Sequence, residues 1–313
     1  MKVSFPRLAV TKHPYRAVTT LGVSALLGVI SAMQAQAECF STSNPKLPND
    51  ELIAPTLTNG EDGWAIVQAV RSGNLDDVET LVRGQPDLLS TRTILPEGVR
   101  PSNGNMADIL TIAVANCDPL MVGALLELGA APNGAIPGLA LTYAALADDL
   151  VMAVVLLQGG ADPDAKTKGR TTVLRELLFY KRSDAVALLA QAGADVNRAE
   201  MFGRTPLDAA LSFGDWNSAK ALMDAGANPW QVSHKGVLPA FRLMNASVQG
   251  GQDRSIRNEL LERVEAGAPI WPPPPPADVI QNVKDGLWPS AAMRQAGFTL
   301  TDGAVRSIEM ISP

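Results

Sequence analysis

Histidine is scarce in this sequence, and its scarcity excludes the most familiar kinds of catalytic and metal site. The 313 residues contain two histidines, His13 and His234, which offer no constellation for a His-based metal site or a Ser-His-Asp triad. No glycine-rich phosphate loop follows a strand, and the acidic pair Asp162 and Asp164 falls on a predicted turn, where solvated carboxylates are ordinary. The sequence therefore predicts no enzyme, no metal ion and no cofactor.

Positive charge is also short once the first 37 residues are set apart. Those residues carry four bases and no acid, which leaves 22 bases against 32 acids in the other 276 residues, a formal charge of −10. A body with this charge repels nucleic acid and anionic lipid at long range. We therefore expect no nucleic-acid partner.

The first 37 residues have the three parts of a secretory signal peptide. A basic stretch ends at Arg16, an uncharged and mainly apolar run extends from 17 to 33, and Ala35-Gln36-Ala37 supplies a small-x-small cleavage site. We expect cleavage between Ala37 and Glu38 and a periplasmic or otherwise exported protein that does not bind a membrane once the leader is removed. The alternative is an uncleaved membrane anchor.

Cysteine is as rare as histidine, and export would place the two cysteines where a disulfide bond can form. An oxidising compartment would let Cys39 and Cys117 form a disulfide that closes a 79-residue loop. On the chain-entropy model such a bond stabilises the fold by about 4.5 kcal/mol. The alternative is two separate thiols, one of them buried.

A helical repeat is the strongest pattern in the chain. Aromatic residues make up 5% of the sequence, whereas Ala and Leu dominate an apolar fraction of 46%, a composition that favours helices. Four helical pairs end in the motif Gly-Ala-Asp/Asn/Ala, with glycines 31, 33 and 33 residues apart at Gly129, Gly160, Gly193 and Gly226. Gly267 follows 41 residues later, which is one period plus an insertion of eight around 247 to 255.

This pattern resembles the ankyrin-repeat family, whose period is 33 and whose first helix opens with Thr-Pro-Leu-His. The best match is Gly203-Arg204-Thr205-Pro206-Leu207-Asp208-Ala209-Ala210, in which Asp208 replaces the usual histidine. Thr205 suits a helix cap, and Pro206 suits the first helical turn. The tetratricopeptide repeat, a rival with a period of 34, does not close its second helix in this way. The resemblance implies an all-α solenoid of about six helix-turn-helix units with divergent terminal units.

The other units depart from the motif. Asp108-Ile109, Leu139-Ala140 and Thr171-Thr172 stand where Thr-Pro is expected. Gly193 and its equivalents suit a left-handed helix stop, and the Asp and Asn residues after them suit turns.

The chain divides into five parts on this basis. The inserted loop at 85–106 is expected to be disordered, with a weak binding role. The proline tract at 272–276 is expected to be an extended spacer, or alternatively a ligand for an aromatic groove on another protein. The tail after it is expected to hold helices around 278 to 285 and 289 to 295. The parts are a signal peptide (1–37), an amino-terminal extension (38–61), the ankyrin repeats (62–269, with the inserted loop at 85–106), a Trp/Pro-rich linker (270–276) and a carboxy-terminal helical tail (277–313).

The resemblance implies that the chain is a non-enzymatic protein-binding module. Members of the family bind other proteins through a concave palm and a row of turn tips. Two exported roles fit: support of an envelope enzyme such as a peroxide-detoxifying catalase, or neutralisation of an exported toxin or enzyme as its immunity or inhibitor partner. The alternatives are a small-molecule or lipid binder, and an enzyme whose site lies in the carboxy-terminal tail.

Basic and aromatic side chains gather at the predicted tips and at one helix end, and these types are enriched in binding hot spots. We expect them to bind an acidic protein surface, unless the charged turns are merely solvated and Phe202 and Trp230 pack onto the core. The predicted partner-binding residues are Lys166, Lys168, Arg170, Tyr180, Lys181, Arg182, Arg198, Phe202, Arg204, Trp230, His234 and Lys235.

Overall fold

The computed structural model describes residues 39–40, 48–102, 104–167, 171–200, 203–295, 298 and 300–310. The cleavage residues Ala37 and Glu38 and the predicted binding residues Lys168, Arg170 and Phe202 lie outside them. The chain divides into two compact units, Met1–Cys39 and Phe40–Pro313, and every element below belongs to the second. Throughout the described ranges the structure is helical, with isolated bridges in place of strands.

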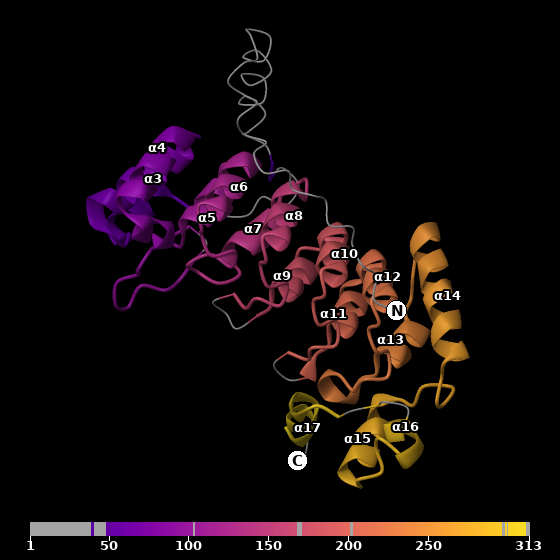
Figure 1. Ribbon diagram of the computed structural model, residues 1–313. Coiled ribbons are helices and arrows are strands. Elements are labelled where there is room, and N and C mark those ends of the chain that lie inside the picture. The colour runs from indigo at the N-terminus through magenta and orange to yellow at the C-terminus, as the bar shows by residue number, and fades with distance from the viewer. Residues whose placement is uncertain are drawn as a thin grey trace. The chain divides into compact units, whose positions relative to one another are not determined.

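Six helix pairs follow one another along the described part of the chain, as the repeat predicted (Figure 1). The helices of each pair are antiparallel neighbours joined by a short turn. The pairs are α3 (Gly60–Arg71) and α4 (Leu75–Gly84), α5 (Ile109–Ala115) and α6 (Pro119–Glu127), α7 (Leu139–Leu146) and α8 (Val151–Gln158), α9 (Val173–Phe179) and α10 (Ser183–Gln191), α11 (Pro206–Phe213) and α12 (Trp216–Asp224), and α13 (Pro239–Asn245) and α14 (Gly251–Ala266).

The first helices of successive pairs form a continuous row. Helix α3 contacts α5, α5 contacts α7, α7 contacts α9, α9 contacts α11, and α11 contacts α13. Second helices pack in the same way, α6 on α8, α10 on α12 and α12 on α14. Fully buried alanines such as Ala144, Ala209 and Ala219 let these helices approach closely. Each pair therefore packs mainly against its neighbours, as in a helical repeat stack.

Capping residues fix where the first helices begin. Thr205 accepts a hydrogen bond from the backbone N–H of Asp208 at 3.2 Å, and Pro206 is the first helical residue, as predicted. Thr172 and Gly138 occupy the same position before α9 and α7. The predicted register was therefore wrong by one residue in these two pairs, because Thr172-Val173 and Gly138-Leu139 correspond to Thr205-Pro206.

Glycine in a left-handed conformation follows α6, α8, α10 and α12 as predicted, whereas Gly267 after α14 has φ −102°. Gly193 has φ +97°, a left-handed conformation that costs glycine little. The N–H groups of Gly193 and Ala194 donate to Ala190 and Leu189 at 3.2 and 3.0 Å, which satisfies carbonyls at the end of α10. The last pair accommodates its insertion partly by lengthening, since α14 has 16 residues where α12 has 9.

The inserted segment 85–106 is held in place where the structure describes it. It opens with the 3₁₀ helix η4 (Pro86–Ser90), and Ile94 N–H then donates to the carbonyl of Thr56 at 2.7 Å. Thr56 ends the 3₁₀ helix η3 (Ala54–Thr56), which follows α2 (Asp50–Ile53) in the amino-terminal extension. Leu88, within η4, is buried. The expectation of disorder is therefore wrong for the described part of this segment.

The carboxy-terminal part contains α15 (Pro276–Lys284), α16 (Ala291–Gln295) and α17 (Asp302–Glu309). The first two correspond to the predicted helical patterns, whereas α17 was not expected. Pro276, the last proline of the tract, is the first residue of α15, and Pro275 has the extended angles φ −66° and ψ 156°. The proline spacer is thus one residue shorter than predicted.

Cys39 and Cys117 are disulfide-bonded, which confirms the predicted pairing. Cys117 lies in the turn between α5 and α6. No helix of the described residues is both long enough and apolar enough to cross a membrane.

Candidate partner-binding surface

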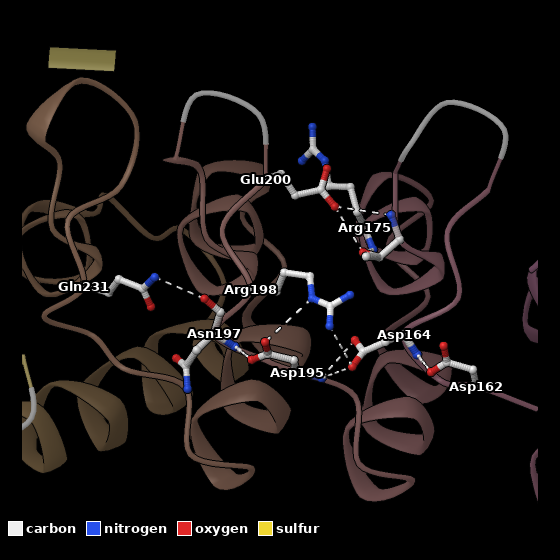
Figure 2. Close-up of polar contacts among 9 residues, drawn as sticks. Asp162, Asp164, Arg175, Asp195, Asn197, Arg198, Glu200 and Gln231 are labelled. Carbon is white, nitrogen blue, oxygen red and sulfur yellow. Dashed lines mark hydrogen bonds and ion pairs between the residues drawn. The ribbon is translucent and has the colours of Figure 1, made fainter. Parts of the chain in front are cut away.

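A ladder of Asp and Asn side chains joins successive helix pairs below the turn tips (Figure 2). The Asp164 carboxylate accepts the backbone N–H of Asp195 at 3.0 and 3.2 Å, and Asn197 Oδ1 accepts that of Asn228 at 2.7 Å. Asn133 accepts in the same way from Asp162, at 2.7 Å. In three of the four units, the residue two positions after the end of the Gly-Ala-Asp/Asn/Ala motif therefore carries the link to the next pair.

The first acidic residue of the motif has a local role. Asp162 Oδ1 accepts the N–H of Asp164 at 2.9 Å, and Asp195 Oδ1 accepts that of Asn197 at 3.0 Å. Such bonds to the residue two positions on define an Asx turn. The sequence predicted the turn but missed the link between pairs, although the Asp-x-Asp/Asn spacing that repeats near every 33 residues carried the signal.

Two predicted cations on this surface are paired within the stack. Arg198 lies 3.4 Å from a carboxylate oxygen of Asp164 and 3.7 Å from one of Asp195. Arg204 lies 3.7 Å from the buried carboxylate of Asp208. Their charge is partly neutralised before any partner arrives.

Asp208, at the position of the usual histidine, is completely buried. Its carboxylate accepts the hydroxyl of Ser233 at 2.9 Å and Arg242 Nε at 2.7 Å, and it also pairs with Arg204. These partners compensate for the burial of the carboxylate. The replacement therefore serves to join α11 to the next turn and to α13.

Arg182 is also used internally. Its guanidinium donates to the carbonyls of Leu146 and Ala147 at 2.5 and 2.6 Å, at the end of α7 in the preceding pair, and pairs with Asp184 at 3.1 Å. It satisfies carbonyls that a helix end leaves free. Its neighbours Tyr180 and Lys181 remain exposed.

The turns that precede α11 and α13 are covered by the carboxy-terminal tail. The Oγ of Ser307, on α17, lies 3.2 Å from His234 Nδ1 and accepts the backbone N–H of Lys235 at 2.9 Å. A methyl group added to Gly203 would meet the backbone nitrogen of Ala304 at 2.6 Å. Helices α15 and α17 both pack on the 3₁₀ helix η6 (His234–Gly236).

Trp230 belongs to this covered region. Its side chain is 4% exposed and lies against Phe298, with ring centroids 6.2 Å apart. The expectation that Trp230 is presented to a partner is therefore wrong, because the chain's own tail takes up its apolar surface. The exposed aromatic that the sequence missed is Phe179, which is 67% exposed and packs edge-on against Tyr180.

A cavity of about 350 Å³ opens beside α7 and α9. Its lining includes Tyr143 and Thr142 of α7, Glu176 of α9, Tyr180 directly after α9, and Thr167 of the turn before α9. Burial raises the pKa of the Glu176 carboxyl, with Arg175 acting to lower it and Glu200 to raise it. Burial, and secondarily Tyr180, raises the pKa of the Tyr143 phenol. No local sequence pattern predicts this cavity, because its walls come from segments far apart in the chain.

Comparison with known proteins supports the repeat and adds no activity. No family model matches the chain. A protein of Acanthamoeba polyphaga mimivirus, which its name describes as an ankyrin repeat protein, is 30% identical over 88 residues. The match covers 25% of this chain and 54% of the relative, so the chain spans about half the length of that protein. In the described residues, no group of three or more His, Cys, Asp or Glu side chains could hold a metal ion.

Proposed function

We propose that the chain is an exported, non-enzymatic ankyrin-repeat module that binds another protein through its row of first helices and the adjoining turns. The observation that carries this proposal is that the row is hollowed in two places. The cavity beside α7 and α9 is one, and a more open hollow of about 560 Å³, lined in part by Phe213 and Phe241, is the other. Ankyrin repeats generally bind proteins and are usually not enzymes.

The contact surface in this proposal is narrower than the set of residues chosen from the sequence. Lys166 and Lys181 are exposed, and each adjoins a residue that lines the cavity, Thr167 and Tyr180 respectively. Phe179 adds exposed apolar surface beside them. These residues, together with the predicted Lys168, Arg170 and Phe202, suit an acidic protein surface.

The identity of the partner decides between the two exported roles. If the partner is an envelope enzyme such as a peroxide-detoxifying catalase, the role of the chain is to support that enzyme. If the partner is a toxin, the role is immunity or inhibition. A small-molecule or lipid binder is the second candidate, because about 350 Å³ falls at the lower end of the volumes that ligand pockets have.

The test begins with capture and identification of the partner from the exported fraction, followed by binding kinetics with charge-reversed variants. Lys166→Glu combined with Lys181→Glu should slow association and weaken its dependence on salt, and Tyr180→Ala should speed dissociation. Lys235→Glu is the matched control, since it reverses an exposed lysine beside the tail-covered turn. Binding that responds only to Lys235→Glu would show that the contact surface lies elsewhere.

A further inference from the structure

The cavity beside α7 and α9 has an unusual set of polar groups for its size. Its lining holds one formal charge, the Glu176 carboxylate, and two phenol rings, those of Tyr143 and Tyr180. The rest of the lining is neutral. It consists of Pro101, Ser102, Met106, Ile136, Pro137, Leu139, Thr142, Leu146 and Thr167.

The Glu176 carboxylate is left open toward this space. It forms no hydrogen bond or ion pair with any side chain in the part of the chain that the structure describes. Arg175, its neighbour on α9, extends toward the next pair, where its guanidinium lies 5.9 Å from the centroid of the Phe213 ring. A half-buried carboxylate that no cation contacts directly costs stability unless a cation approaches it.

The walls of the cavity are fixed by contacts that do not use Glu176. Asp108 accepts the backbone N–H of Ile136 at 2.8 Å, and a methyl group on Gly134 would come within 2.4 Å of the same carboxylate. The hydroxyl of Thr142 is committed to the carbonyl of Gly138 at 2.7 Å. The space is therefore preformed, and the Glu176 carboxylate is the one formal charge in its lining.

We propose that this cavity binds an alkylammonium or guanidinium group, supplied as a lysine or arginine side chain by the protein partner. A carboxylate forms strong charge-assisted hydrogen bonds with both groups, and tyrosine faces attract cations. A space of about 350 Å³ admits one long side chain and excludes a folded segment. This inference rests on the proposed function and deepens it: the partner carries a basic side chain within an otherwise acidic contact surface, opposite Glu176 and the rim lysines Lys166 and Lys181.

Direct binding of small probes to the full mature chain tests this inference without the partner. The probes are Nα-acetyl-lysine methylamide, the arginine equivalent, the neutral norleucine equivalent, and putrescine as a free amine. Tyrosine-ring NMR signals report binding at Tyr143 and Tyr180. We expect the lysine or arginine probe to shift these signals saturably, and Glu176→Gln to weaken binding about ten- to a hundredfold.

Controls separate the cavity from the rest of the acidic surface. Glu265→Gln removes an exposed carboxylate on α14 and should leave probe binding unchanged. Equal binding by Glu176→Gln, or by the norleucine probe, would overturn the inference. Tighter binding by putrescine than by the amino-acid probes would overturn the assignment to a partner side chain. Probe binding that appears only after Lys168→Gln and Arg170→Gln would show that the chain's own cations occupy the space, and would also overturn it.

The fate of the partner complex distinguishes this inference from the proposed function. If Lys166→Glu with Lys181→Glu weakens the complex and Glu176→Gln does not, the palm is the binding surface and the cavity is not its cation site. If neither change affects the complex, the proposed function itself fails.

Discussion

The turn before α9 and the turns before α11 and α13 follow one plan, yet the chain uses them differently. The first borders an open cavity and leaves Lys166 exposed, and Tyr180 is exposed beside the same cavity at the end of α9. The other two are covered by α15 and α17, which take up His234 and the backbone at Gly203. Basic and aromatic residues at a turn tip therefore do not by themselves tell whether the turn contacts another protein or another part of the same chain. In the carboxy-terminal pairs, the tail of the same chain packs on the turns.

The two ends of the chain are also held in different ways. Cys39 is tied to Cys117 by a covalent bond, and the adjoining Phe40 packs edge-on against Tyr143 of the cavity wall, with ring centroids 6.4 Å apart. The described part of the tail is held by non-covalent contacts, namely hydrogen bonds, close backbone packing and the contact between Phe298 and Trp230. We therefore expect the stability of the region around the cavity to depend on redox conditions, and the stability of the turns before α11 and α13 to depend on the tail.

The largest expected effect is loss of the disulfide. Replacing Cys39 and Cys117 together by serine should lower the free energy of unfolding by up to about 4.5 kcal/mol, because the 79-residue loop regains entropy in the unfolded chain. Urea unfolding of the oxidised protein and the variant measures this difference. Wild-type protein in reductant serves as the control, and its free energy of unfolding should match that of the variant. A decrease in the free energy of unfolding below about 1 kcal/mol would contradict a stabilising role of the disulfide.

The next effect tests the packing of the covered side. Ala209 is fully buried, so Ala209→Asp should cost about 3 kcal/mol or more by placing an unpaired charge between helices. Thr205→Ala removes a helix cap from the same helix and should cost about 1 kcal/mol. Denaturant unfolding of both variants gives the ratio. Equal losses would mean that Ala209 does not face the helix packing.

Two glycines sharpen the claim that the tail covers the turn before α11. Gly203 and Gly193 both have positive φ, but a methyl group on Gly193 meets nothing within 4 Å, whereas one on Gly203 strikes the tail backbone. Gly203→Ala should therefore cost about 1–3 kcal/mol more than Gly193→Ala. Limited proteolysis should cut the tail of Gly203→Ala faster than that of Gly193→Ala. Equal cleavage of the two variants would show that the tail does not rest on this turn.

The smallest effect concerns Glu176 and the pH. Because burial raises its folded-state pKa, the folded protein favours the neutral carboxyl, and ionisation lowers the free energy of unfolding as the pH rises through that pKa. Glu176→Gln should therefore be more stable than wild type at neutral pH, and the difference should vanish below the ordinary value of 4.5. Thermal melts between acid and neutral pH measure it. A Glu176→Gln protein that is less stable than wild type at neutral pH would contradict the assignment.

The helix pairs could be predicted because each carries its own local signals. A capping residue, a run of small apolar residues and a glycine stop recur near every 33 residues, and these act over a few positions. The register failed before α7, where Gly138 replaces a side-chain cap and an additional residue lies in the turn before α8. There, backbone conformation decides the start of the helix.

The covered turns and the cavity could not be predicted in the same way. Gly203 meets Ala304 across about a hundred residues of chain, and neither position has a local pattern that selects the other. The cavity combines the inserted segment with α7 and α9, so Glu176 looks in the sequence like an ordinary helix-surface acid. Long-range packing, rather than local propensity, sets both features.

Site-specific photo-crosslinking tests the central comparison most directly. A photoreactive amino acid placed at Tyr180, on the open side, should capture the same partner that is identified by pull-down from the exported fraction. The same group at Lys235, on the covered side, should crosslink within the chain to the tail. Capture of the partner from Lys235 and none from Tyr180 would contradict the account, because it would place the binding surface on the turns that the tail is said to cover.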